Sequence, residues 1–339
     1  MTSPGHHILE QLAGRPLAED GESRSTALAT LGLPVDAVEL RLDEPMARHT
    51  TLRLGGPADL WAVPGSVEAL SALLARCRET RVPVTVVGSG TNLLVRDGGL
   101  RGLVLNLRKL NRVWRPDPEA EPTQVEVEAG TSTGRLLSRA CEWSLGKLEF
   151  LGGVPGSVGG GLIMNAGTYL GEFTDVVTRV RSLDLGGQPI TRDHPACGFR
   201  YRGSDLPTDE IVVAASLTLE PRPRERIDAA VAELRQRRRE REPKGVPNNG
   251  STFKNPDGDH AGRLIEAAGL KGARRGGALV SPVHANWLVV DKLVAPKCTS
   301  ADLLALIDFV GAEVERLHGV VLRTEVKIIG EHGSQGATL

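Results

Sequence analysis

Hydrophobic and polar residues recur with a helical period over several segments of the chain. Ser66 is a suitable N-cap for the first predicted helix, because a serine hydroxyl can accept a hydrogen bond from the following turn. The apolar face of this helix comprises Val67, Leu70, Leu73, Leu74 and Cys77. The same spacing predicts helices over residues 133–145, 226–242 and 261–269, and from Ser300 to a stop at Gly319. The last helix carries Leu303, Leu304, Ile307, Val310, Val314 and Leu317 on one side.

Alternation with a period of two, or a short apolar run, predicts strands between these helices. The segments are residues 82–87, 102–107, 123–130, 178–185, 210–219, 286–290 and 320–330. Helices and strands alternate along the chain, and 339 residues are sufficient for two or three domains with their own cores. The proline-rich residues 221–223 are the expected domain boundary. Residues 1–50 are expected to be a partly flexible extension and lead-in, and residues 333–339 a flexible tail.

The composition excludes several classes of protein. A formal net charge of −1 provides no general attraction to nucleic acid or to an anionic membrane. We expect no signal peptide and no membrane span, because the N-terminus lacks a basic start followed by an apolar run and no uncharged apolar stretch approaches about 18 residues. The four cysteines lie far apart without CxxC spacing, which argues against zinc and disulfides and fits a reducing cytoplasm.

Two glycine-rich segments suggest contact between a ligand and the main chain. GSGTN, residues 88–92, follows a predicted buried strand, and successive N–H groups in such a turn can form an anion site. GGVPGSVGGG, residues 152–161, has more glycine than a turn needs, which suggests a diphosphate cofactor lying across backbone amides. The alternatives are an ordinary turn at a strand end for the first segment and close backbone packing at a sheet crossing for the second. The first segment does not match the dinucleotide fingerprint, because Leu93 occupies its last glycine position.

A third segment, VPNNGSTFKNP at residues 246–256, places the hydroxyl of Ser251 between glycine and threonine. Proline, asparagine and glycine in succession favour a stiff turn. The residues alone leave two interpretations open: a plain connection between two elements, or a loop that holds one hydroxyl in a fixed place.

These segments and several others together resemble the UDP-N-acetylenolpyruvoylglucosamine reductase (MurB) family. The matching stretches, in family order between residues 49 and 330, are HTTLRLGGPADL, VVGSGTNLLVRDGG, GGVPGSVGGGLIMNAGTYLGE, YRGSDL, GSTFKNP, AGRLIEAAGLKG and RTEVKIIG. The resemblance implies a p-cresol methylhydroxylase-type FAD-binding domain over residues 51–221 and a separate, smaller α+β substrate-binding domain over residues 222–332. The short segment between Tyr201 and Ser251 resembles the subtype without an extra tyrosine-bearing loop.

The resemblance also implies a reaction. Members of the family reduce UDP-N-acetylglucosamine enolpyruvate to UDP-N-acetylmuramate for peptidoglycan, and so serve cell wall biogenesis, cell shape and cell division. Hydride passes from NADPH to FAD and from flavin N5 to C3, and a proton reaches C2. We therefore expect a cytoplasmic, monomeric oxidoreductase that acts on small molecules, with no metal and no nucleic-acid or membrane partner. Noncovalent FAD is expected, because neither glycine segment contains a histidine or cysteine that could tether the flavin.

The family pattern assigns site residues as well. Those expected to hold the FAD pyrophosphate are Gly88, Ser89, Gly90, Thr91, Asn92, Gly153, Pro155, Gly156, Ser157, Gly159 and Gly160. Those expected to bind the substrate are Tyr201, Lys254, Asn255, Lys271, Arg275, His284 and Asn286, with Arg274 a further cation for its diphosphate. Solvated surface is the alternative for each substrate residue.

Arg202, Ser251 and Glu325 fall on the family's three catalytic positions. Hydride addition to the enol ether builds negative charge that is delocalised into a carboxylate, and the guanidinium fork of Arg202 suits those oxygens. The Ser251 hydroxyl is expected to supply the proton, because such a transfer depends on position more than on acidity. Glu325 is expected to orient Arg202 or to hydrogen-bond the enolate. From pattern alone, Arg202 could equally be a strand residue in a surface pair and Glu325 an exposed strand residue.

Two other functions stay open from the residues. One is a small-alcohol oxidase or dehydrogenase on the same fold, which reaction of the reduced protein with oxygen would indicate. The other is a non-catalytic nucleotide-binding module, which a colourless protein without FAD would indicate.

Overall fold

The computed structural model describes residues 3–17, 23–34, 36–291, 293 and 297–333, which form two compact units. Unit 1 draws on residues 1–44, 58–89 and 101–236, and unit 2 on residues 45–57, 90–100 and 237–339. The last division lies inside helix α6 (Arg224–Arg241), whereas the domain boundary expected from the sequence is at residues 221–223. The reason is that α6 buries Ile227, Val231 and Leu234, the first two of them in the core of unit 1.

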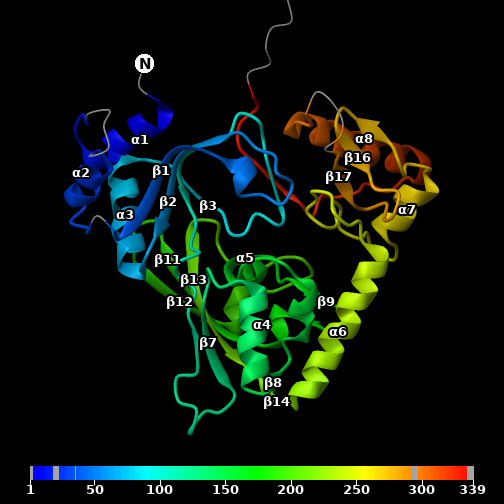
Figure 1. The fold of residues 1–339 in the computed structure, drawn as a ribbon, viewed down its shortest axis with the longest axis horizontal. Helices are drawn as coiled ribbons and strands as arrows, with labels where there is room; N and C mark the ends of the chain where they lie inside the picture. Colours follow the sequence, from blue (N-terminus) through cyan, green and yellow to red (C-terminus); the bar gives the residue numbers. More distant parts are fainter. Residues whose placement is uncertain (1–2, 18–22, 35, 292, 294–296, 334–339) are drawn as a thin grey trace, which may run out of the picture. The chain divides into compact units, whose positions relative to one another are not determined.

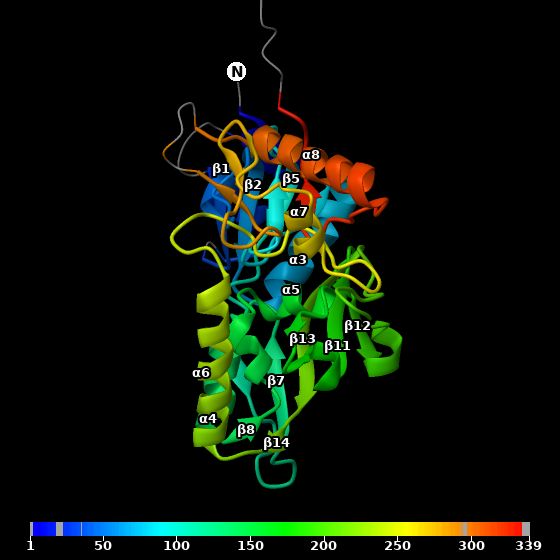
Figure 2. The same cartoon turned by 90° about the vertical axis from the view of Figure 1, so that its right-hand side faces the viewer.

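Two larger sheets form the framework of unit 1. The first has the order β1 (Val38–Pro45), β2 (Pro57–Pro64), β5 (Leu100–Leu105) and β3 (Val84–Val86), and β3 runs parallel to β5. The second is antiparallel, with the order β12 (Pro189–Asp193), β11 (Val177–Asp184), β13 (Glu210–Thr218), β7 (Gln124–Glu128) and β6 (Val113–Trp114). Figure 2 shows β7, β13, β11 and β12 side by side. The strands predicted within residues 82–130 and 178–219 are confirmed, with ends shifted by at most about two residues.

The helices of unit 1 follow the predicted spacing where they were predicted. They are α1 (Pro4–Ala13), α2 (Ser23–Thr30), α3 (Val67–Thr80), α4 (Thr133–Glu142), α5 (Val158–Ile163) and the first part of α6. The Ser66 hydroxyl accepts a hydrogen bond from the Ala69 N–H at 3.2 Å, which confirms the predicted cap of α3. Short elements complete the unit: β8 (Leu145–Gly146), β9 (Gly167–Thr168), β10 (Gly171–Glu172), β14 (Glu220–Pro221) and the 3₁₀ turns η2 (Glu149–Gly153), η3 (Phe173–Asp175) and η4 (His194–Cys197).

The first helix was expected to belong to a partly flexible extension, but α1 is packed into the core of unit 1. Leu9 is 0% exposed and Leu12 is 1% exposed. The Arg76 guanidinium of α3 donates to the Leu12 carbonyl oxygen at 2.7 Å. Figure 1 shows α1 and α2 beside α3 at the N-terminal end of the chain. Hydrophobic burial and this hydrogen bond therefore hold a segment whose sequence pattern is weak.

Unit 2 has a second core around a small antiparallel sheet and two helices. The sheet has the order β15 (Arg274–Arg275), β16 (Ala278–Val280) and β17 (Leu288–Val290), and α7 (Ala261–Ala267) and α8 (Ser300–His318) contribute side chains to the same core. A parallel pair joins β4 (Leu93–Val95) to β18 (Lys327–Ile329), and η1 (Met46–Arg48) lies in the same unit. The stop of α8 at Gly319 is confirmed, because that residue caps the helix with a φ of 68°. Its buried face includes Leu306, whereas Leu317 is 46% exposed, so the predicted face is displaced toward its start.

The long strand predicted over residues 320–330 is wrong in extent, since only Lys327–Ile329 is a strand. The residues before it make other contacts: Phe253 and Thr324 form an isolated bridge, and the Glu325 N–H donates to the Thr252 carbonyl oxygen. Across the described ranges no helix is long and apolar enough to cross a membrane, and no group of histidine, cysteine and carboxylate side chains is suited to hold a metal ion.

Candidate active site

The first glycine segment, residues 88–92, follows β3, and the division between the units falls between Ser89 and Gly90. On the unit 1 side, the Val87 N–H donates to the Leu105 carbonyl oxygen at 2.9 Å. In the described part of the chain the N–H groups of Gly88 and Ser89 make no hydrogen bond. These two backbone donors are therefore available to an anion.

The second glycine segment meets the first within unit 1. A Cβ atom at Gly88 would lie 2.5 Å from the Oγ of Ser157, closer than real Cβ contacts come. Ser157 immediately precedes α5, while Gly153 ends η2 and Pro155 lies between them. The structure thus brings the two expected pyrophosphate segments into contact, and it does so through a glycine whose missing side chain makes room.

Close packing explains part of the second segment. A Cβ at Gly161 would lie 2.4 Å from the ring of Phe173, and a Cβ at Gly159 would lie 3.1 Å from the Ala129 side chain. A Cβ at Gly160, in contrast, would meet only the Ser157 hydroxyl, at 3.5 Å. Close packing therefore accounts for Gly159 and Gly161, whereas Gly160 has open space beside it.

A stretch of three hydroxyl residues, 131–133, supports the second segment and was not singled out from the sequence. The Thr131 carbonyl oxygen accepts the Val158 N–H at 2.9 Å. The Thr133 hydroxyl donates to the Val154 carbonyl oxygen at 2.6 Å, and the Thr133 N–H donates to the Gly156 carbonyl oxygen at 3.0 Å. The available signal was the run Thr-Ser-Thr directly after the alternating strand at residues 123–130.

Arg202 lies in a tight turn of unit 1 and not in a strand. The backbones of Arg200 and Gly203 exchange hydrogen bonds of 3.0 and 3.1 Å, and Arg202 between them has a φ of 53°. Few residues with a side chain adopt that conformation, so the surrounding contacts must hold it. One such contact is the Arg202 guanidinium donating to the Gly167 carbonyl oxygen at 3.2 Å. Another is the side chain of Asn165, 0% exposed, which donates to the Arg200 carbonyl oxygen at 3.2 Å.

Unit 2 brings the loop of Ser251 together with Glu325. The Thr252 carbonyl oxygen accepts the Glu325 N–H at 2.8 Å, so the two expected catalytic residues lie on paired backbone segments. The Asn92 side chain, at the end of the first glycine segment, donates to the Glu325 carbonyl oxygen at 3.0 Å. Glu325 is in a bend just before β18, so its strand assignment is corrected. The Ser251 hydroxyl has no hydrogen-bond partner among the residues that the structure describes, which leaves it available as a donor.

Asn286 was expected to contact the substrate, but its side chain is used inside the protein. It is 3% exposed, and its amide accepts the Phe253 N–H at 2.9 Å and donates to the Phe253 carbonyl oxygen at 2.8 Å. These bonds fix the backbone two residues after Ser251. The neighbouring His284 accepts the Asn286 N–H at 3.2 Å, and burial, with the positive charge of Lys271, lowers the pKa of His284 below its usual value.

Several expected substrate residues already have protein partners. Lys271 pairs with Glu266 at 2.7 Å, and Arg274 pairs with Asp291 at 2.8 Å. The remaining contacts are the Arg275 guanidinium 3.8 Å from the Phe309 ring centre, the Asn255 side-chain oxygen accepting the Ala261 N–H at 3.1 Å, and the Lys254 N–H donating to the Arg323 carbonyl oxygen at 2.8 Å. Tyr201 is 53% exposed, with the Arg202 guanidinium 5.1 Å from its ring centre.

The joined glycine segments of unit 1, with two unpaired backbone donors, fit the diphosphate of FAD. Residues 58–192 also match the family described as an FAD binding domain. The class of protein is therefore an FAD-binding oxidoreductase with an α+β fold, which confirms the expected FAD-binding domain.

The rest of the chain narrows the class to one family. Residues 242–329 match the family described as UDP-N-acetylenolpyruvoylglucosamine reductase, C-terminal domain. The chain is 44% identical over 289 residues to the UDP-N-acetylenolpyruvoylglucosamine reductase of Anaeromyxobacter dehalogenans (strain 2CP-C), covering 85% of each chain. It is 42% identical over 294 residues to the reductase of Caldanaerobacter subterraneus subsp. tengcongensis, covering 86% of this chain and 94% of that one.

A solved structure agrees with these relatives. The UDP-N-acetylenolpyruvylglucosamine reductase (MurB) of Thermus caldophilus is similar with a TM-score of 0.70 and 34% identity, covering 86% of this chain and 98% of the other. This chain belongs to the UDP-N-acetylenolpyruvoylglucosamine reductase family.

Proposed function

We propose that the chain uses NADPH to reduce the enolpyruvyl group of UDP-N-acetylglucosamine enolpyruvate, which yields UDP-N-acetylmuramate. The observation that carries the proposal is the pairing, in unit 2, of the Ser251 loop with the backbone of Glu325. Noncovalent FAD, when bound, supplies the hydride chemistry between the nicotinamide and C3 of the substrate. The described residues 88–92 and 152–161 contain no histidine or cysteine side chain that could tether the flavin.

The chain's own residues bind the cofactor through its phosphates. The N–H groups of Gly88 and Ser89 would donate to the diphosphate, because they have no partner in the part of the chain that the structure describes. The surroundings of Gly160 are open, so this glycine would allow the phosphates to come close to the backbone of the second segment. Thr131 and Thr133 would hold the second segment in place through their hydrogen bonds to its backbone.

Arg202 would bind the substrate carboxylate, whose oxygens take up the charge that develops during reduction. A guanidinium keeps its charge at every relevant pH and forms two parallel hydrogen bonds with a carboxylate. Groups that stabilise charge growing in the transition state usually contribute the largest single catalytic effect. The strained turn supports this role, because it fixes the guanidinium before the substrate arrives.

Ser251 would deliver the proton to C2, and Glu325 would orient Arg202 or hydrogen-bond the developing enolate. The Ser251 hydroxyl makes no competing bond among the described residues, and the backbone around it is held by Thr252, Phe253 and Asn286. The position of the donor hydroxyl matters more than its acidity when the proton acceptor is a strong base at short range.

Substrate contacts outside the reacting group are proposed for Tyr201, Lys254, Asn255 and His284. Lys271, Arg274 and Arg275, which already contact Glu266, Asp291 and the Phe309 ring, are proposed for the substrate diphosphate. We further propose that the protein works as a monomer in the cytoplasm, in peptidoglycan precursor synthesis.

An anaerobic stopped-flow experiment tests the proposal. The yellow protein is reduced with NADPH, and UDP-N-acetylglucosamine enolpyruvate is then added while flavin absorbance is followed. Ser251→Ala should leave reduction by NADPH unchanged and slow reoxidation by substrate about 10²–10⁴-fold, as for loss of a general acid. Ser71→Ala is a matched control, because that hydroxyl lies in α3 and donates to the Gly187 carbonyl oxygen.

The outcomes separate the proposal from its alternatives. Unchanged reoxidation in Ser251→Ala would remove the serine from the mechanism. Failure of the substrate to reoxidise the wild-type flavin, with fast reoxidation by oxygen, would favour an oxidase on the same fold. A colourless protein that takes up no FAD would leave a nucleotide-binding module.

A further inference from the structure

Asn106 follows β5 and makes hydrogen bonds at every position of its side-chain amide. The side chain donates to the carbonyl oxygen of Val87 at 2.8 Å and of Gly88 at 2.9 Å, and it accepts the Arg108 N–H at 3.1 Å. Asn106 is 8% exposed, so these bonds are shielded from water. An amide that is buried and fully paired specifies the position of its partners.

The geometry of the peptide bond gives this contact a direction. A trans peptide holds its N–H on the side opposite to its C=O. Because Asn106 binds the carbonyl oxygens of Val87 and Gly88, the N–H groups of the same two peptides, which belong to Gly88 and Ser89, point away from it. Neither of these two N–H groups makes a hydrogen bond among the described residues.

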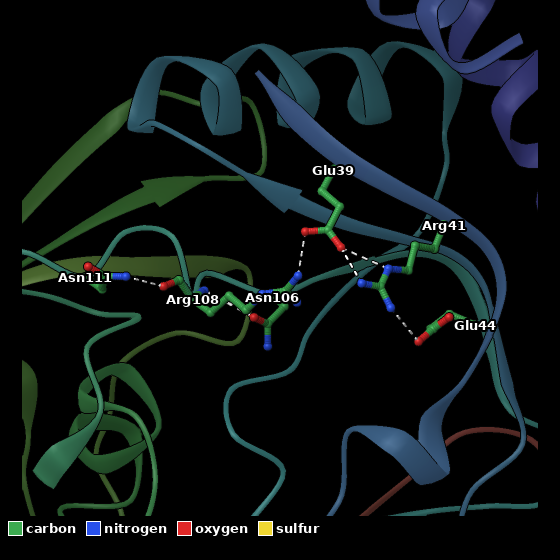
Figure 3. Close-up of polar contacts among 6 residues, drawn as sticks. All are labelled: Glu39, Arg41, Glu44, Asn106, Arg108 and Asn111. Atoms are coloured by element: carbon green, nitrogen blue, oxygen red, sulfur yellow. Dashed lines mark hydrogen bonds and ion pairs between the residues drawn. The ribbon is translucent and has the colours of Figure 1, made fainter. Parts of the chain in front are cut away.

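Ion pairs anchor the segment that carries Asn106. The Arg108 guanidinium binds the Glu39 carboxylate of β1 at 2.6 Å. Arg41 binds the same carboxylate at 2.6 Å and Glu44 at 3.2 Å. Figure 3 shows this chain of contacts from β1 to Asn106. The amide therefore belongs to a fixed framework of unit 1.

We propose that Asn106 is a positioning residue for FAD, which aims the Gly88 and Ser89 N–H groups at an oxygen of the cofactor's diphosphate. The inference rests on the proposed assignment of residues 88–92 to the pyrophosphate. Asn106 does not touch the cofactor; it sets the orientation of the two peptides that do.

Three substitutions test this role through FAD affinity. Asn106→Ala removes both donors, Asn106→Ser keeps one, and Asn106→Asp keeps the acceptor for Arg108 but places a carboxylate against two carbonyl oxygens. Holoprotein is diluted in series, and free FAD is measured by fluorescence after ultrafiltration. Asn106→Ala should weaken FAD binding about 10-fold or more, since each lost hydrogen bond costs a factor of several, and Asn106→Ser should be intermediate.

The Asn106→Asp variant provides a second measurement, the pH dependence of FAD binding, which a general loss of structure would not change. A carboxyl group packed against carbonyl oxygens has a raised pKa, so it gains a proton as the pH falls and can then donate to one of them. The ratio of variant to wild-type FAD dissociation constants should therefore fall between pH 8 and about pH 6. Although burial acts to raise it, hydrogen bonds from Arg41 and Arg108 hold the pKa of Glu39 below its usual value, so this neighbouring carboxylate keeps its charge over the same range.

Asn111→Asp is the matched control. Asn111 donates to the Arg108 carbonyl oxygen at 2.7 Å, so the substitution makes the same change of charge beside the same segment without reaching Val87 or Gly88. It should leave FAD affinity within about twofold of the wild type. Equal weakening by Asn106→Asp and Asn111→Asp, or wild-type affinity in Asn106→Ala and Asn106→Ser, would overturn the proposal.

A separate pair of variants tests the assignment on which the proposal rests. Ser89 is exposed, so Ser89→Asp adds a negative charge at the segment without disturbing the core, and Ser89→Asn is its neutral counterpart. If the segment holds the diphosphate, Ser89→Asp should weaken FAD binding at least tenfold more than Ser89→Asn. Equal affinities would remove the diphosphate assignment itself, whereas a large Ser89→Asp effect with unaffected Asn106 variants would overturn only the role of Asn106.

Discussion

Replacing Asn286 by alanine should loosen the loop of Ser251 by a predictable amount. The substitution leaves the Phe253 N–H and C=O groups without their partners at 2.9 and 2.8 Å, and Phe253 is 2% exposed. A buried polar group left unpaired costs about 1–3 kcal/mol. Two such groups, relieved in part by water entering the space of the lost side chain, give a loss of about 2–4 kcal/mol in local stability.

Hydrogen exchange measured by mass spectrometry is the appropriate assay. The chain has two compact units, so a single global free energy of unfolding is not well defined, whereas exchange reports each segment separately. A loss of 2–4 kcal/mol corresponds to about 30–1000-fold faster exchange in the peptide covering residues 247–256. Asn255→Ala is the control, since it removes an asparagine from the same loop but only one bond, to the Ala261 N–H.

A role of Asn286 in substrate binding would give the opposite result. If Asn286 serves the substrate, as its residue type suggested, Asn286→Ala should raise KM and leave exchange in this loop within about threefold of the wild type. That result would refute the structural reasoning. Fast exchange together with slower flavin reoxidation by substrate would support it, because Ser251 would then be held less well.

Three further outcomes are expected. Glu325→Gln should slow flavin reoxidation by substrate more than reduction by NADPH in stopped flow; equal losses in both steps would count against its assignment. Gly161→Ala should lower the urea midpoint of the apoprotein clearly more than Gly160→Ala, because a Cβ at Gly161 would lie 2.4 Å from the Phe173 ring whereas Gly160 has open space; similar midpoints would contradict the packing argument. Burial raises the pKa of Cys77 to about 12, so native protein at pH 8 should react with iodoacetamide far more slowly at this cysteine than protein in urea, as peptide mass spectrometry can show. Fast native labelling there would refute that burial.

Local patterns were sufficient for much of the fold. The cap at Ser66 and the glycine stop at Gly319 depend on atoms within one helical turn, and both are confirmed. The family resemblance likewise depends on short contiguous stretches, such as those at residues 88–92 and 152–161, and the comparisons confirm the family. Short motifs in a fixed order along the chain are therefore sufficient to identify the class of cofactor.

The arrangement of the candidate site could not be read in the same way. Asn92 and Glu325 are 233 residues apart, and they meet only because β4 pairs in parallel with β18. The same contacts end the last strand early and place Glu325 in a bend. Periodicity does not indicate which distant segment a strand will pair with. The strand expected over residues 320–330 is therefore longer than the observed strand, Lys327–Ile329.

Residue type alone also left the purpose of the asparagines undetermined. Asn286 was expected to bind the substrate and Asn106 carried no expectation, yet both bind backbone groups of another segment from a buried position. The sequence by itself determined helices α3, α4, α6, α7 and α8, the strands β3, β5, β7, β11 and β13, the glycine segments and the family. Only the tertiary structure decided which peptide groups those amides satisfy and which remain unpaired, because a buried polar group takes whatever partner the folded backbone brings within reach.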